Sequence, residues 1–218
     1  MTINDVLNMT FPSNFGSGEE DIETDCICEV EYNLSTKYNV RTAYGASKFV
    51  IFLNDNEVVK IPFTGSYSYG WNDENDEIDY DEIIFDEFCT EDYCAVEAAV
   101  YSDAIAAGVE QFFASTKFVG NTFIDKTPIY LSERVLPFDC LNNKERSYSR
   151  DSYLKAGKMC GRCPVEWTAM ALEYYGETAV KKLFAFIESE GIDDFHDGNV
   201  GIRKDGSPCI LDYSGFNS

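Results

Sequence analysis

The sequence predicts an α+β fold, with an antiparallel sheet and one long helix followed along the chain by a reduced helical part. Two apolar, β-branched runs, 48–53 and 57–63, flank the Asn/Asp turn at 54–56, which is typical of an antiparallel hairpin. Residues 92–107 and about 165–189 place apolar side chains at helical spacing. The 218 residues allow one domain, or one fold made of two lobes.

The first predicted helix, 92–107, ends at Gly108, a residue that favours a C-terminal cap. Glu97 lies beside its apolar face, where the carboxylate can turn inward. The apolar residues of this face recur at intervals of three and four: Tyr93, Val96, Val100 and Ala104. The second helical region ends at Gly191, and its apolar face is formed by Val180, Leu183, Phe184 and Ile187.

Shorter apolar segments predict further strands. Residues 112–120 and 128–135 are the clearest of these, and residues 27–32 are compatible with a short strand near the N-terminus. Residues 139–163 are polar and are predicted to be mostly loop.

The chain carries 39 acidic and 17 basic residues, for a formal net charge of −22. Such a field repels the phosphates of nucleic acids and anionic membrane surfaces, so binding to either is not expected. It is compatible with a basic protein partner, with imitation of the charge of DNA, or simply with solubility. The acidic residues are densest in 64–92, where interleaved aromatic and aliphatic residues indicate that the segment is partly packed.

No apolar run reaches the ~20 residues needed to cross a bilayer, and the N-terminus does not resemble a signal peptide, so a cytoplasmic protein is expected. Eight cysteines are therefore expected to be reduced structural residues. Cys160 and Cys163 form a C-x-x-C that is compatible with half of a zinc site or with a redox pair, although a second pair of suitable spacing is missing.

The candidate site lies near the end of the chain. Asp194 is followed by Asn199 five positions later and by Asp212 thirteen positions after that. An Asp that orients a hydroxyl, followed by an Asn and an Asp that hold a divalent metal, is the pattern of phosphoryl transfer. Apolar, strand-like residues at 200–202 and 209–211 flank the last two positions.

This segment resembles the catalytic and metal loops of the protein-kinase-like superfamily. His196 lies two residues after Asp194, and a histidine at this position resembles the branch that contains aminoglycoside and choline kinases. The resemblance implies a two-lobed fold that uses ATP and Mg²⁺. Asp194 would orient the acceptor hydroxyl, His196 would contact the transferring phosphate or support the loop, and Asn199 and Asp212 would hold the metal.

The same resemblance assigns nucleotide-binding roles upstream. The strand 58–61 resembles the V-A-I-K strand, which places Lys60 on the α- and β-phosphates and Glu97 as the partner that orients Lys60. Gly45 and Ser47 belong to a much reduced Gly-rich loop. Two further residues, Glu133 and Val135, fall by their order along the chain in the connector whose backbone binds adenine.

By this resemblance the chain divides into an N-terminal extension (1–41), an N-lobe with an acidic insertion (42–138) and a reduced C-lobe (139–218). Asp193 replaces the arginine of the H-R-D loop, so activation through a phosphate paired to that arginine is not expected. The sequence ends six residues after Asp212, without the later helices that form a platform for peptide substrates.

Two classes of function therefore remain open. The first is a minimal kinase that phosphorylates a protein, itself or a small molecule. The second is a kinase-fold binding protein that uses its acidic surface to inhibit a partner or to mimic DNA, as small phage-encoded proteins can. The sequence does not select an acceptor or an oligomeric state.

Overall fold

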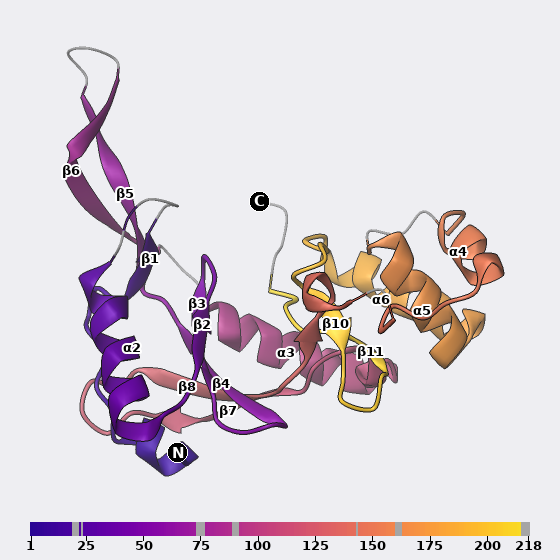
Figure 1. Cartoon of the computed structure of the whole chain (residues 1–218), viewed down its shortest axis with the longest axis horizontal. Coiled ribbons are helices and arrows are strands. Elements are labelled where there is room, and N and C mark those ends of the chain that lie inside the picture. Colours follow the sequence, from indigo (N-terminus) through magenta and orange to yellow (C-terminus); the bar gives the residue numbers. More distant parts are fainter. Residues whose placement is uncertain are drawn as a thin grey trace. The chain divides into compact units, whose positions relative to one another are not determined.

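The computed structural model describes residues 1–18, 22, 24–72, 77–88, 92–142, 144–159 and 163–214. The chain forms two compact units (Figure 1). The first unit consists of Met1–Ala95 and Lys117–Ser132, and the second of Val96–Thr116 and Glu133–Ser218. The sequence predicted three segments with boundaries after residues 41 and 138. These segments differ from the two compact units and stay a prediction about domain organisation.

The first unit is built around a five-stranded sheet of order β2-β3-β4-β8-β7. The predicted hairpin is confirmed, since β3 (Lys48–Phe52) and β4 (Glu57–Pro62) pair antiparallel, with Val50 opposite Lys60. The remaining strands are β2 (Thr42–Tyr44), β7 (Thr116–Asn121) and β8 (Pro128–Glu133). The strand predicted at 112–120 begins only at Thr116, because Glu110–Phe112 form the 3-10 turn η1.

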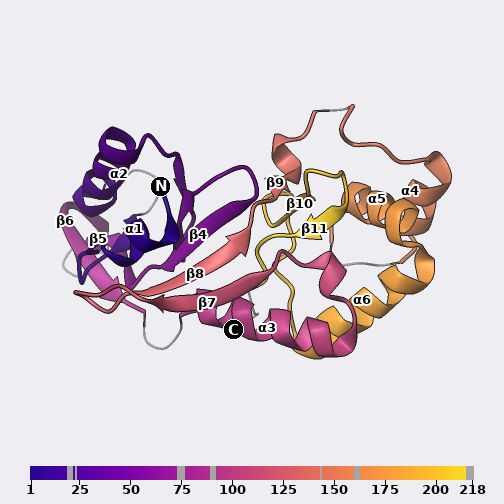
Figure 2. The ribbon, with the colours of Figure 1, turned by 90° about the horizontal axis from the view of Figure 1, so that it is seen from below.

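Two N-terminal helices, α1 (Ile3–Leu7) and α2 (Asp25–Tyr38), share one core with this sheet (Figure 2). The strand predicted at 27–32 is wrong, because these residues lie within α2. Ile27, Val30 and Leu34 are buried at helical spacing, so packing on one face outweighs the strand propensity of a short apolar run. Residues 1–41 thus contribute to the core of the first unit.

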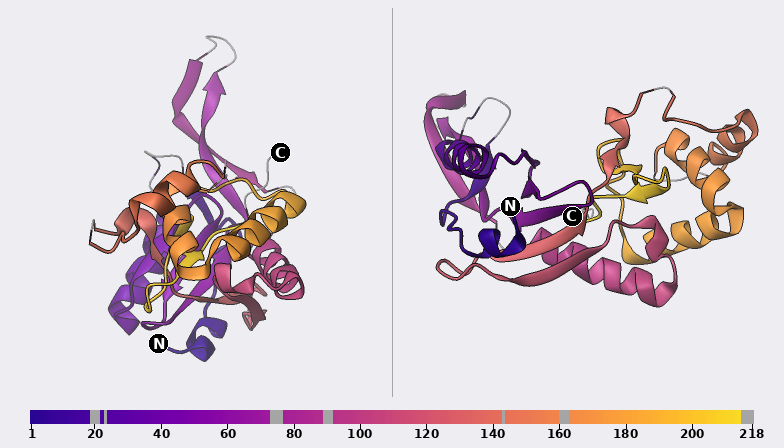
Figure 3. Two further views of the ribbon diagram at one scale, coloured as in Figure 1. Left: turned by 90° about the vertical axis from the view of Figure 1, so that its right-hand side faces the viewer. Right: turned by 60° about the horizontal axis from the view of Figure 1, so that its bottom comes forward.

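The acidic segment forms most of a second sheet in the first unit. β5 (Gly65–Asn72) and β6 (Glu77–Glu87) pair antiparallel, and β1 (Gly16–Gly18) pairs parallel with the start of β5. A Cβ at Gly16 would lie 2.3 Å from the carbonyl oxygen of Gly65, so glycine permits this close pairing. Beyond β1, β5 and β6 continue as a long two-stranded ribbon (Figure 3, left).

The predicted helix at 92–107 is confirmed as α3 (Tyr93–Ala107), and Gly108 follows it with a φ of +64°. Its buried face differs from the prediction, because Cys94 and Glu97 are fully buried whereas Tyr93 and Val96 are only partly buried. The apolar spacing therefore predicted the position of the helix along the chain correctly, but not which of its faces is buried.

The second unit contains three further helices and a small antiparallel sheet. The helices are α4 (Arg150–Ala156), α5 (Val165–Tyr175) and α6 (Glu177–Glu190), and α5 packs against the other two and against β11. The sheet has the order β11-β10-β9, formed by Pro208–Ile210, Val200–Ile202 and Leu136–Pro137. The 3-10 turn η2 (Phe138–Cys140) follows β9.

The second helical region is not continuous as predicted. Gly176 adopts a φ of +82° and a ψ of 159° between α5 and α6, a conformation that favours glycine and ends the first helix. Gly191 ends α6 in the left-handed conformation, as expected. The α+β class is confirmed, and within the described ranges no helix is long and apolar enough to cross a membrane.

Candidate active site

The structure brings Asp194, Asn199 and Asp212 together within the second unit. The Nδ2 group of Asn199 donates to the backbone oxygen of Asp194 at 2.9 Å and to its Oδ2 at 3.2 Å. The backbone oxygen of Asn199 accepts from the amides of Leu211 at 2.9 Å and Asp212 at 3.3 Å. Three positions that the sequence spreads over nineteen residues therefore form one hydrogen-bonded group.

The elements around the loop explain this arrangement. Helix α6 ends at Gly191, and the next residues anchor the loop because Ile192 and Phe195 are buried in the core. Asn199 directly precedes β10, and Asp212 follows β11 by two residues. Val200 pairs with Ile210 in this antiparallel hairpin, so the start of β10 lies beside the end of β11.

Asp194 and His196 face solvent on this loop. Their side chains are 58% and 63% exposed, and the Nε2 atom of His196 lies 4.0 Å from Oδ1 of Asp194. The Nδ1 atom of His196 accepts from the amide of Gly198 at 3.0 Å. When the imidazole is neutral, this bond leaves the proton on Nε2, directed toward the Asp194 carboxylate. His196 therefore supports the turn through Gly198, and its Nε2 lies near the Asp194 carboxylate but beyond hydrogen-bond distance.

Three residues that the sequence did not select also contribute to the loop. The Ser214 hydroxyl donates to Oδ1 of Asp212 at 3.1 Å. The Tyr213 ring is buried, and its hydroxyl donates to the backbone oxygen of Ala114 at 2.7 Å. Asp139 lies against the turn, since a Cβ at Gly198 would be 3.7 Å from its Oδ2. Because Asp139 is an isolated aspartate in a polar segment, the sequence alone did not predict its contact with this turn.

Burial and the charge of Glu97 hold the pKa of the Tyr213 hydroxyl well above its usual value. Glu97 itself is fully buried in the second unit, and the Thr116 hydroxyl lies 3.5 Å from its Oε2. The inward orientation that the sequence suggested for Glu97 is confirmed. Its pairing with Lys60 stays a prediction, since the two residues belong to different units.

Lys60 is buried on β4 in the first unit, with 5% of its surface exposed. Side chains alternate between the faces of a strand, and Phe49, Ile51, Val59 and Ile61 form the core face. Lys60 therefore lies on the opposite face of the hairpin, together with Lys48, whose side chain is also buried. Lys48 is a second cation of this face that the sequence analysis did not select.

The reduced loop of Gly45 and Ser47 is the tight turn between β2 and β3. The Gly45 amide donates to the backbone oxygen of Lys48 at 3.1 Å, and the backbone oxygen of Ser47 accepts from Phe63 at 3.0 Å. Gly45 is exposed, and a Cβ added there would meet no atom within 4 Å beyond its chain neighbours. A side chain at Gly45 would therefore point into open solvent.

The two connector residues have clear structural partners in the second unit. The Nε group of Arg203 donates to both carboxylate oxygens of Glu133, at 2.9 and 3.0 Å, and the Glu133 amide donates to the backbone oxygen of Ser115. Val135 packs in a small apolar cluster with Ala114 and Cys209. The side chains of Glu133 and Val135 therefore stabilise the second unit.

The predicted C-x-x-C is described only in part. Cys160 lies outside the described residues, whereas Cys163 is buried in the core of the second unit. Burial raises the pKa of the Cys163 thiol well above its usual range, which disfavours the thiolate. In the part of the chain that the structure describes, no three His, Cys, Asp or Glu side chains gather in a way that could hold a metal ion.

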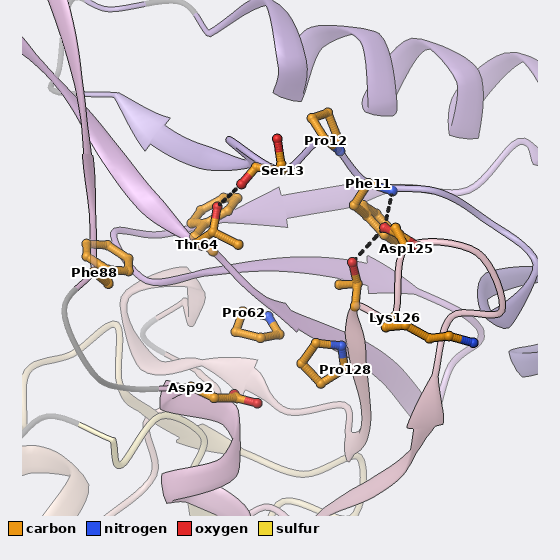
Figure 4. Close-up of a pocket in the computed structure, with 12 residues that line it drawn as sticks. Phe11, Pro12, Ser13, Pro62, Thr64, Phe88, Asp92, Asp125, Lys126 and Pro128 are labelled. Carbon is orange, nitrogen blue, oxygen red and sulfur yellow. Dashed lines mark hydrogen bonds between the residues drawn. The ribbon is translucent and has the colours of Figure 1, made fainter.

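A separate pocket of about 640 Å³ lies within the first unit (Figure 4). Its two carboxylates, Asp92 and Asp125, both have structural roles. Asp92 accepts from the amides of Cys94 and Ala95 at the start of α3, and from the Tyr130 hydroxyl at 2.5 Å. Burial and this contact with Asp92 raise the pKa of Tyr130. Both carboxylates of this pocket are therefore engaged in hydrogen bonds within the first unit.

Asp125 in this pocket predicts a dependence of stability on pH. Partial burial raises the pKa of Asp125, but hydrogen bonds from Thr122, Thr127 and the Phe11 amide lower it below its usual value. A lowered pKa in the folded state contributes stability above the ordinary Asp value of about 4, and this stability is lost as the pH falls through the folded pKa.

We expect Asp125→Asn to lower the melting temperature at pH 7 by on the order of 2 °C, a small effect because Asp125 is largely exposed to solvent. The difference from the unmodified chain should shrink as the pH falls below about 4. Melting followed by circular dichroism at pH 7 and pH 3 measures both. A difference that grows toward pH 3 would contradict the assignment.

Comparisons with known proteins do not assign a family. No protein-family model and no curated protein matches the sequence. Among solved structures, the chain has a weak match to the streptomycin–ATP–APH(2″)-IIa ternary complex, with 12% sequence identity and a TM-score of 0.32. The match covers 90% of this chain and 72% of that chain. A likeness of this size assigns no function, so the functional argument rests on the side chains.

Proposed function

We propose that this chain is an ATP- and Mg²⁺-dependent phosphotransferase that acts on a hydroxyl group of a protein, either a partner or the chain itself. The observation that carries the proposal is the hydrogen-bonded group of Asp194, Asn199 and Asp212. Phosphoryl transfer requires mainly positioning and the neutralisation of charge; these residues can position the acceptor and would hold the metal ion that neutralises the charge.

Asp194 is the residue that orients the acceptor hydroxyl. Its carboxylate is exposed, so an incoming hydroxyl can reach it, and the hydrogen bond from Asn199 restricts its rotation. A carboxylate held in this way accepts a hydrogen bond from the hydroxyl and directs the oxygen lone pair toward the phosphorus.

The donor set fits Mg²⁺. Nδ2 of Asn199 donates to Asp194, so the amide oxygen of Asn199 and the Asp212 carboxylate would be the ligands that these residues offer to the metal. Mg²⁺ prefers hard oxygen ligands and takes only one or two from protein, with the others from phosphates and water. Bound there, Mg²⁺ would neutralise charge on the phosphates of ATP, which supplies the transferred group.

The nucleotide-binding roles belong to the same proposal. Lys60 would contact the α- and β-phosphates, and Glu97 would orient Lys60. Each of these side chains is buried within its own unit. Gly45 and Ser47 would cover the phosphates, and the backbone near Glu133 and Val135 would contact adenine. We place this activity in the cytoplasm.

Incubation of the purified chain with Mg²⁺ and γ-labelled ATP tests the proposal. We expect label on the chain or on an added protein acceptor, and an increase in melting temperature with ATP and Mg²⁺. Asp212→Ala should abolish both the transfer and the Mg²⁺-dependent part of the stabilisation. Asp103→Ala, which removes one exposed carboxylate from α3, is the matched control for the change in charge and should leave both unchanged.

The absence of both label transfer and stabilisation by nucleotide would reject the enzyme and favour a binding protein. Stabilisation without transfer would indicate a nucleotide-binding protein that lacks the chemistry.

A further inference from the structure

The ribbon formed by β5 and β6 has one apolar face. The register pairs Tyr67 with Phe85, Tyr69 with Ile83, and Trp71 with Ile78. Since alternate residues of β5 point to the same side, these six side chains share one face, here called the ribbon face. Ring contacts confirm the arrangement at Tyr67 and Phe85, whose centroids are 4.7 Å apart.

Much of the ribbon face is exposed to solvent. Trp71 and Ile83 are each 55% exposed and Ile78 is 46% exposed, and Tyr80, whose ring contacts Tyr69, is 68% exposed. β1 pairs with β5 only at Gly65–Tyr67, so the outer part of the ribbon is two-stranded. A two-stranded ribbon is marginally stable in water unless its apolar face is covered, so an exposed face of this kind indicates an interaction surface.

The opposite face of the ribbon carries mostly small and acidic side chains. Ser66, Ser68 and Gly70 alternate with the apolar residues of β5, and Asp86 and Asp79 lie across from Ser66 and Gly70. The side chain of Glu82 lies close to Gly70, because a Cβ added to Gly70 would be 2.6 Å from Oε2 of Glu82. Ile84, which is 39% exposed, lies across from Ser68 on this face, so the face combines carboxylates with one aliphatic side chain.

β6 lies at the edge of its sheet, and Ile83–Glu87 form its regular part beyond the irregularity at Tyr69 and Gly70. A strand added beside this edge would continue the alternation of the sheet. Its side chains of one parity would extend the ribbon face beside Ile83 and Phe85, and those of the other parity would lie beside Ile84 and Asp86. The edge thus selects an extended segment that alternates apolar and basic residues.

We propose that this edge of β6 and the ribbon face bind an extended segment of a basic partner protein, with apolar side chains on the ribbon face and lysine or arginine on the acidic face. A second copy of this chain fits poorly, because each copy carries a net charge of −22 and would repel the other. The proposal does not depend on phosphotransferase activity.

Trp71 provides a direct probe, because it lies on the ribbon face whereas Trp167 is fully buried in the second unit. We would titrate the full chain with a short peptide of alternating Lys and Val, and follow tryptophan emission and the anisotropy of the labelled peptide. The expected result is saturable binding with emission shifted to shorter wavelength. The shift should disappear in Trp71→Phe, and binding should weaken as salt rises from about 50 mM to about 500 mM.

Matched variants and peptides separate this site from general attraction of charge. Ile83→Ser should weaken binding by about tenfold, whereas Ile124→Ser, an exposed isoleucine between β7 and β8, should leave it unchanged. Peptides of alternating Lys and Ser, or Glu and Val, should bind at least tenfold more weakly. Melting curves would verify that both variants are folded, which is expected because both positions are exposed.

Three results would overturn the proposal. Equal binding of the Lys/Val and Lys/Ser peptides would show that charge alone attracts the peptide, and full binding by Ile83→Ser would place the site elsewhere. A dimer of the unmodified chain in sedimentation that Ile83→Ser converts to a monomer would show that a second copy occupies the ribbon face.

Discussion

Asp194→Asn is expected to lower the rate of phosphoryl transfer by about 10²–10⁴-fold, the usual contribution of a positioned acid or base, while the fold and the binding of nucleotide persist. The substitution keeps the size of the side chain, and the bond from Asn199 to the backbone oxygen of residue 194 at 2.9 Å does not depend on the carboxylate. The loop should therefore remain in place without the negative charge that orients the hydroxyl. Single-turnover transfer from labelled ATP measures the effect.

Asp193→Asn is the matched control for this experiment, since it removes the same charge one residue earlier. In the structure the Asn199 amide donates to Asp194, and the neighbouring residue has no place in the proposed chemistry. We expect it to retain transfer within a few-fold of the unmodified chain. Equal losses in the two variants would show that the loop responds to net charge and would remove Asp194 from its proposed role.

Trp167→Ala is expected to lower the free energy of unfolding by about 3–5 kcal/mol, the range observed when a buried aromatic residue is truncated. Trp167 is fully buried on α5, and its Nε1 group donates to the backbone oxygen of Gly201 at 3.0 Å. Gly201 lies in β10 so close to β9 that a Cβ there would be 2.1 Å from the oxygen of Leu136. The variant would therefore open a cavity and leave a buried carbonyl without its donor.

The effect of Trp167→Ala should also reach the candidate site, because β10 begins directly after Asn199. Urea unfolding measures the stability, and label transfer by the folded fraction measures the site. Trp71→Ala is the matched control, since its side chain is 55% exposed, and we expect a change within about 0.5 kcal/mol. Similar losses in the two variants would contradict the assignment of Trp167 to the core.

The elements that the sequence predicted well are those specified by neighbouring residues. The hairpin of β3 and β4 follows from two β-branched runs around an Asn/Asp turn, and α3 ends at Gly108 because glycine adopts the required positive φ. The predictions that failed required the tertiary context. Residues 27–32 are helical because α2 buries Ile27 and Val30 in a shared core, and Gly176 interrupts a region whose apolar spacing continues on both sides.

The sequence by itself determined the order and spacing of Asp194, Asn199 and Asp212, because a loop of fixed length and two short strands connect them. Only the tertiary structure decided what surrounds them: Trp167 beneath β10, Asp139 against the turn at Gly198, and Arg203 on Glu133. The physical reason is distance along the chain. Periodicity and turn chemistry report on residues a few positions apart, whereas Arg203 and Glu133 are 70 positions apart and meet only in the folded unit.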